Sequence, residues 1–142
     1  MDAIWQAIAS ALKLLRLELR GDKAECDWMT RTPDEGDSAF PRLMQDQQAS
    51  LQALHDAIGM REMLFCAIPD VNSAELRTYR QSAREPPYLI IRGTVTREPP
   101  AANVKRMTSL VMRAKVYGFK FWMDNGALAP LGTVEHRLGF AI

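Results

Sequence analysis

Apolar side chains recur at helical spacing through the first twenty residues. Seven of them would form one stripe of a helix: Ile4, Trp5, Ile8, Ala11, Leu12, Leu15 and Leu19. A period of 3.6 residues is typical of an amphipathic helix, so this pattern predicts a helix over residues 2–20 that ends at Gly21. Leu14 and Leu17 fall outside the stripe, and we expect this helix to expose them as an interaction element.

The next part of the chain alternates between strand and helix patterns. Alternating apolar positions over residues 24–31 predict a short strand, and the acidic segment 32–38 predicts a loop. Pro41 opens a second predicted helix, which ends at Gly59. The apolar run over residues 63–68 then predicts a buried strand.

Two more helices are expected in the second half of the chain. Asn72 and Glu75 have the spacing of a capping box, which predicts a third helix. A β-branched strand follows over residues 88–95. A fourth helix is expected over residues 104–117, capped by Gly118.

The last part of the chain is expected to consist of strands. Asn125 and Gly126 give the strongest short hairpin signal in the sequence, because this pair favours a tight primed turn. They would join a strand over residues 119–123 to one that begins near Ala127. Clean alternation of apolar positions over residues 134–142 predicts a C-terminal strand.

These patterns predict a single domain over residues 1–142 with a mixed α/β (α+β-like) sandwich fold. Four helices would pack on a mixed four- to five-stranded sheet that ends in an antiparallel C-terminal hairpin. Of the 142 residues 47% are hydrophobic and 25% are charged, which is typical of a globular chain that can bury one core.

The apolar runs and the cysteines indicate the cellular setting. No apolar run is long enough to span a bilayer. Asp2 stands where a signal peptide carries its basic segment, and Lys13 interrupts the stretch that would be its apolar segment. Cys26 and Cys66 are expected to be unpaired thiols, with Cys66 in the core. We therefore expect a cytoplasmic protein with no membrane partner.

The net charge of +1 conceals an uneven distribution. Residues 21–70 carry ten Asp and Glu against four Lys and Arg, whereas residues 71–120 carry ten Lys and Arg against three Asp and Glu. Six cations at helical spacing on the third and fourth predicted helices are candidate binding residues: Arg77, Arg80, Arg84, Lys105, Arg106 and Arg113. Such a surface could bind phosphate groups, or it could pair with the acidic half of this chain or of a second copy.

Motifs with known chemistry are missing from the sequence. It contains no GxGxxG after a strand, no GxxxxGK[ST], and no HExxH, GxSxG or CxxC. The two cysteines and two histidines belong to four different predicted elements, without the paired spacing of zinc ligands, and the acidic cluster in residues 34–37 matches no calcium loop. We therefore assign no catalytic residue, metal site or cofactor.

The sequence does not identify a reaction or a ligand, and three hypotheses remain. We expect a non-enzymatic binding or protein-interaction module that forms a homodimer, in which the second copy covers Leu14 and Leu17. The first alternative is a module that binds phosphate or nucleic acid through the basic face of residues 77–120, although the near-neutral charge does not favour nucleic acid. The second alternative is a small enzyme without a recognisable motif.

Overall fold

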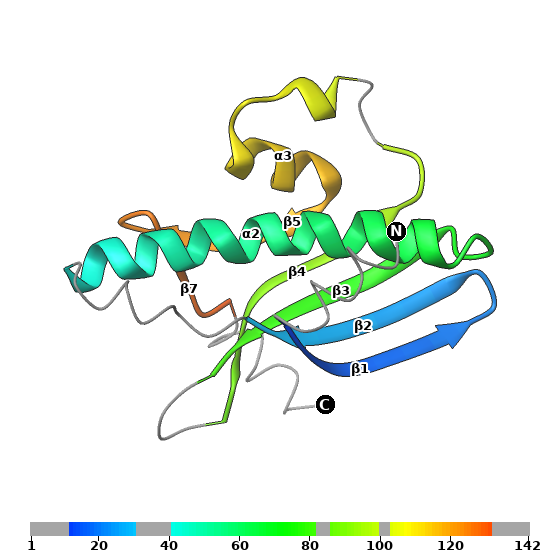
Figure 1. Ribbon diagram of the computed structural model, residues 1–142, viewed down its shortest axis with the longest axis horizontal. Coiled ribbons are helices and arrows are strands. Elements are labelled where there is room, and N and C mark those ends of the chain that lie inside the picture. Colours follow the sequence, from blue (N-terminus) through cyan, green and yellow to red (C-terminus); the bar gives the residue numbers. More distant parts are fainter. Residues whose placement is uncertain (1–11, 31–40, 82–85, 100–102, 132–142) are drawn as a thin grey trace.

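The computed structural model describes residues 12–30, 41–81, 86–99 and 103–131 (Figure 1). Five strands form one mixed sheet in the order β1-β2-β3-β4-β5. The strands of this sheet are β1 (Lys13–Arg20), β2 (Lys23–Met29), β3 (Ser73–Arg80), β4 (Tyr88–Thr96) and β5 (Phe119–Lys120). β2 and β3 run parallel because the long helix α2 (Arg42–Ala67) connects them, whereas the other neighbours are antiparallel.

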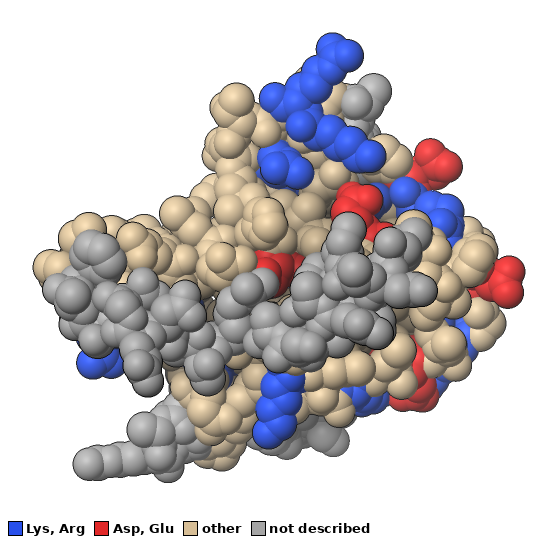
Figure 2. Space-filling view, viewed as in Figure 1, with Lys and Arg blue, Asp and Glu red and all other residues tan. Residues whose placement is uncertain are grey.

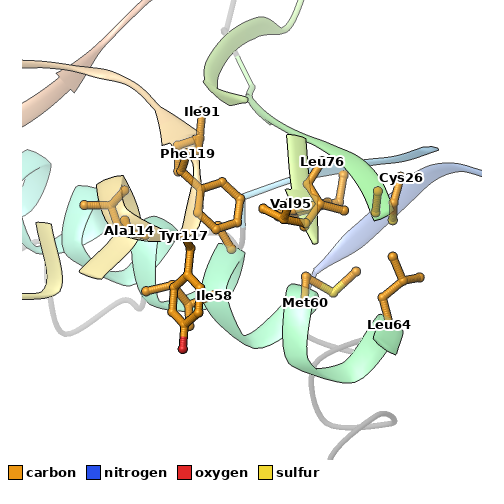
Figure 3. Packing of buried hydrophobic residues seen from close by; sticks show 14 of the residues in the cluster. Cys26, Ile58, Met60, Leu64, Leu76, Ile91, Val95, Ala114, Tyr117 and Phe119 are labelled. Carbon is orange, nitrogen blue, oxygen red and sulfur yellow. The ribbon is translucent and has the colours of Figure 1, made fainter. Parts of the chain in front are cut away.

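The helix α2 lies across one side of the sheet, and their contact forms the core (Figure 1). Every second side chain of the central strands points to this side, as the pleat of a strand requires. Figure 3 shows Leu76 and Val95 of the strands, together with Cys26, close to Met60 and Leu64 of α2. All five side chains are buried.

A second helix, α3 (Leu110–Tyr117), extends the same core together with β5. Tyr117 and Phe119 are buried in the cluster (Figure 3). Phe119 lies opposite Gly93 of β4, and a Cβ atom at Gly93 would lie 2.8 Å from the carbonyl oxygen of Gly118 and 3.0 Å from the Phe119 ring. Only glycine permits this close approach of β4 to the corner between α3 and β5.

The expected architecture of four helices on one sheet is wrong. The described residues form two α-helices, the short 3-10 helix η2 (Val104–Arg106) and seven strands in two sheets. The prediction failed because two expected helices are strands, one expected strand belongs to α2, and the hairpin does not join the main sheet. The predicted loop over residues 32–38 and the predicted strand over residues 134–142 lie outside the described residues.

The predicted helix over residues 2–20 is wrong for residues 13–20, which form β1, while residues 2–11 lie outside the described residues. In this strand Leu17 and Leu19 alternate with Arg16, Glu18 and Arg20, which is a strand period. The helical stripe included these leucines because apolar residues three or four positions apart also fit a period of 3.6. Pairing along the whole of β2 selects the strand, because it satisfies the backbone groups of both segments.

The predicted third helix is also a strand, β3. Ala74, Leu76 and Thr78 are buried, and the residues between them are not. The capping-box spacing of Asn72 and Glu75 was misleading, because this segment is hydrogen-bonded between β2 and β4 in the middle of the sheet. Tertiary pairing here outweighs a local helix signal.

The predicted strand over residues 63–68 is the end of α2, which continues through Gly59 to Ala67. Met63, Leu64 and Phe65 are all buried, although three consecutive residues cannot share one face of a helix. The end of α2 is therefore covered on more than one side. The sequence showed only a short apolar run, which is the ambiguous case for helix and strand.

The predicted fourth helix is divided into η2 and α3. Between them the chain is extended, and the Ser109 hydroxyl accepts a hydrogen bond from the Met112 amide at 3.3 Å, which caps α3. The predicted cap at the other end is confirmed, since Gly118 has a φ of 110° in the left-handed region.

The predicted hairpin at Asn125 and Gly126 is confirmed, and it joins β6 (Trp122–Asp124) to β7 (Ala127–Ala129). Both turn residues have positive φ, 53° and 78°, as a primed turn requires. The hairpin forms a separate sheet on α2: Gln47 donates to the carbonyl oxygen of Asn125 at 2.8 Å, and the Ser50 hydroxyl accepts from the Leu128 amide at 2.7 Å.

The two cysteines are free thiols, but their expected positions are partly wrong. Cys66 is exposed rather than in the core, because α2 turns this position to solvent near its end. Cys26 is buried on β2 against α2. Burial, with a smaller effect of the Asp27 charge, raises the pKa of the Cys26 thiol to about 12.

Candidate interaction surface

The edge strand β1 carries the largest group of exposed leucines in the described residues. The exposed fractions are 44% for Leu14, 45% for Leu15, 39% for Leu17 and 52% for Leu19. Single exposed leucines are common on protein surfaces, but four within six residues of one strand are not. The expectation that Leu14 and Leu17 are exposed is therefore confirmed, although they lie on a strand and not on a helix.

Three of these leucines point to the same side of the sheet as the core. The pairing sets Leu14 opposite Trp28, Leu17 opposite Cys26 and Leu19 opposite Ala24. Opposite residues in antiparallel strands share a face, and these β2 residues are all buried. The leucines thus continue the apolar side of the sheet to its edge.

The helix α2 does not cover this edge. Helix α2 packs against β3 and β4 in the middle of the sheet. In Figure 1, β1 is the edge strand and lies away from α2. Leu15 lies at a shift of register between Leu14 and Arg16, where one residue of β1 has no opposite partner. The apolar side of β1 is therefore accessible to another surface.

The other side of β1 carries a compact set of ion pairs. Arg16 donates hydrogen bonds to Glu25, at 2.6 Å, and to Glu18, and it lies 3.8 Å from Asp27. Arg20 donates to Glu18 at 2.6 Å. Hydrogen bonds from the two arginines lower the pKa of Glu18, which therefore stays ionised. Along β1 the charges alternate in sign between Arg16, Glu18 and Arg20.

The predicted basic surface is not one surface in the structure. Arg77 points away from α2, where it donates to Asp27 at 3.0 Å and also to Glu75. Partial burial lowers the pKa of Arg77, but the hydrogen bond and charge of Asp27 outweigh this effect and the pKa is raised. Arg80 points toward α2, with contacts to the Leu128 carbonyl oxygen at 3.4 Å and the Ser50 hydroxyl at 3.5 Å.

The separation of Arg77 and Arg80 follows directly from the strand. Residues three positions apart share a helix flank but point to opposite sides of a strand. Arg84 lies outside the described residues. The predicted stripe on the third helix is therefore wrong, because it depended on a helix that does not form.

The other three candidate cations lie near one another in the fold. Lys105 and Arg106 are exposed on η2, and Arg113 is half-buried on the neighbouring α3. Figure 2 shows Lys and Arg side chains gathered in this region. This group of three cations lies on a different part of the molecule from Arg77.

Sequence reasoning missed Leu15 and Leu19 as exposed residues. It assigned both to the buried stripe of the predicted helix. The alternation of leucine with charged residues over residues 15–20 was the signal that could have identified them.

In the described part of the chain, no three His, Cys, Asp or Glu side chains come together to form a metal site. None of the helices that the structure describes is long and apolar enough to cross a membrane. A comparison of the chain with protein-family models, curated proteins and solved structures finds no match.

Proposed function

We propose that the chain is a non-enzymatic protein-interaction module of the cytoplasm that forms a homodimer through β1. The accessible leucines of this edge strand are the observation that supports the proposal. An edge strand presents unpaired backbone groups, and a second strand can satisfy them. Apolar contacts on one side and ion pairs on the other would then add to the pairing.

A second copy fits β1 because the strand is complementary to itself. Antiparallel pairing about a two-fold axis at Leu17 sets Leu17 against Leu17 of the second copy. It also sets Arg16 opposite Glu18 of the second copy, and Glu18 opposite its Arg16. Opposite charges therefore meet on the polar side, Leu17 meets Leu17, and Leu15 meets Leu19 of the second copy, while Leu14 falls opposite Arg20.

Other registers fit less well. Pairing centred on Arg16 or on Glu18 sets that residue against the same charge in the second copy, which is destabilising. Pairing centred on Leu19 joins Glu18 to Arg20 of the second copy, but it uses only the end of the strand. The register centred on Leu17 combines the longest overlap with opposite charges.

Light scattering at tens of micromolar tests the dimer. We expect twice the monomer mass for the unmodified protein, and the monomer mass for the double variant Leu14→Lys with Leu17→Lys, with an unchanged circular dichroism spectrum. The matched control replaces two similarly exposed leucines of α2, Leu43→Lys with Leu51→Lys, and should remain a dimer. A monomeric unmodified protein overturns the proposal, and so does a dimeric β1 variant.

A mixing experiment tests the register without depending on the leucines. Arg16→Glu places Glu opposite Glu18 of the second copy, and Glu18→Arg places Arg opposite Arg16, so each variant alone should be monomeric. In a mixture each contact joins opposite charges, and a heterodimer should form. If the mixture remains monomeric while both variants are folded, the register centred on Leu17 is wrong.

A further inference from the structure

The helix α3 exposes an apolar strip that consists of Met112 and Val116. Met112 is 52% exposed and Val116 is half-buried. The two residues are four positions apart, so they are neighbours on one side of the helix, while the fully buried side chains of α3 face the core. At 3.6 residues per turn, Arg113 and Lys115 lie on the two flanks of this strip. The α3 strip therefore presents apolar surface between two cations.

The cations around the α3 strip are not balanced by acidic residues. Residues 99–123 contain five Lys and Arg and no Asp or Glu. Lys105 and Arg106 lie on η2, which contacts α3, and Figure 2 shows Lys and Arg side chains gathered in this region. In the part of the chain that the structure describes, neither these two cations nor the two that flank the strip form an ion pair. The surface is therefore complementary to a negatively charged partner.

Arg113 has the geometry to hold a carboxylate. Its side chain is half-buried, and its Nε atom is buried without a hydrogen-bond partner. Its two terminal nitrogens are not buried, and they form no hydrogen bond with the described residues. Burial of the stem restricts the side chain, so little conformational freedom is lost when the guanidinium binds. The free end of the guanidinium can donate to both oxygens of one carboxylate.

The apolar strip favours a protein partner over a nucleic acid. Methionine and arginine are enriched at protein interfaces, whereas proteins that hold a single strand present aromatic rings on which bases stack. Here the exposed apolar side chain between the cations is Met112, which is flexible enough to fit the apolar side chains of a partner. A partner helix can present apolar side chains four positions apart with acidic ones on both flanks, which matches the α3 strip.

We propose that the α3 strip binds an acidic amphipathic helix of a partner protein. Apolar side chains of that helix pack on Met112 and Val116, and its carboxylates pair with Arg113 and Lys115. Lys105 and Arg106 attract the same negative charge from η2. This surface is separate from the β1 edge, so the proposal does not depend on the homodimer.

Nuclear magnetic resonance titration of the full chain with two synthetic helical peptides tests the proposal. Both peptides carry leucines on one face, and the flanking positions are glutamate in the first peptide and glutamine in the second. We expect the glutamate peptide to bind at least about tenfold more tightly and to shift the Met112, Arg113 and Val116 amide signals. Equal affinities of the two peptides, no binding of either, or shifts confined to β1 would overturn the proposal.

Variants separate this site from general electrostatic attraction. Arg113→Gln should weaken binding of the glutamate peptide by about tenfold or more, with little change in melting temperature, because the chain itself loses no hydrogen bond. Met112→Glu places a negative charge in the exposed strip and should abolish binding. Arg42→Gln removes an exposed cation at the start of α2 and should leave the affinity unchanged. Equal losses in the two arginine variants would overturn the site.

Two further measurements test the kind of partner. A single-stranded oligonucleotide that binds more tightly than the glutamate peptide, and loses this binding in Arg113→Gln, would assign the surface to nucleic acid and overturn the proposal. Light scattering of Arg113→Gln should give the same mass as the unmodified protein. A lower mass would assign the surface to contact with a second copy, which would also overturn the proposal.

Discussion

Arg97, just after β4, donates a hydrogen bond of 2.7 Å to the carbonyl oxygen of Phe65 in the last turn of α2. The same guanidinium donates to Ile68 at 2.9 Å, and its Nε atom donates to Val71 at 3.0 Å. Carbonyl groups at the end of a helix have no partner within the helix. Arg97 therefore caps α2 and fixes the end of the helix to the sheet.

Replacing Arg97 by methionine should lower the free energy of unfolding by roughly 2–3 kcal/mol, because several carbonyl groups lose a charged donor. Urea unfolding measures this difference. Arg42→Met, at the exposed start of α2, is the matched control and should change stability by less than about 0.5 kcal/mol. Equal effects in the two variants would contradict the capping role.

Replacing Ser50 by alanine should loosen the β6–β7 hairpin from α2. Ser50 is fully buried, and its loss leaves the Leu128 amide without its acceptor, which should cost about 1–3 kcal/mol. Gln47→Ala removes an exposed hydrogen bond to the same hairpin and should cost about 0.5 kcal/mol. Hydrogen exchange at Leu128 gives a local readout, and unchanged protection there in Ser50→Ala would contradict this account.

Replacing Gly93 by alanine should lower the free energy of unfolding by about 1–3 kcal/mol, because the new methyl group would overlap backbone at the α3–β5 corner. Thermal unfolding measures this change. Thr94→Ser, at the neighbouring exposed position of β4, should have little effect. A melting temperature for Gly93→Ala equal to that of the unmodified protein would show that the corner moves without cost.

Alkylation should distinguish the two thiols. Cys66 is exposed, so iodoacetamide can reach its sulfur and should alkylate it in the folded protein. Cys26 is buried and its pKa is about 12, so it should react only after unfolding. Peptide mass mapping of the native protein should therefore find label on Cys66 alone, and label on native Cys26 would contradict its burial.

The raised pKa of Cys26 also predicts a loss of stability in alkali. The neutral thiol is favoured in the folded state, so its contribution is complete below the ordinary pKa of 9.0 and is lost as the pH rises toward about 12. Urea unfolding on either side of pH 9.0 measures this loss. Cys26→Ala should show a smaller decline with pH, and an equal decline would assign the effect to other groups.

The elements that the sequence predicted correctly are those with local causes. The turn at Asn125 and Gly126 and the cap at Gly118 depend on left-handed backbone, which asparagine and glycine adopt readily. β2 was recognisable because its apolar positions alternate, and β4 because it is rich in β-branched residues. Exposure of Leu14 and Leu17 was also predicted, although from a helix that does not form.

The elements that the sequence did not predict depend on distant parts of the chain. The segments of β1 and β3 carry patterns that fit a helix as well as a strand, and pairing with β2 selects the strand. That choice separates Arg77 from Arg80 and brings Arg77 into a row with Arg92 and Lys120. By itself the sequence determined the turn at Asn125 and Gly126 and the helix end at Gly118, because these depend on local backbone preference. Only the tertiary structure decided which side of the molecule each charge occupies, because this depends on sheet register, and register joins residues that are far apart in the chain.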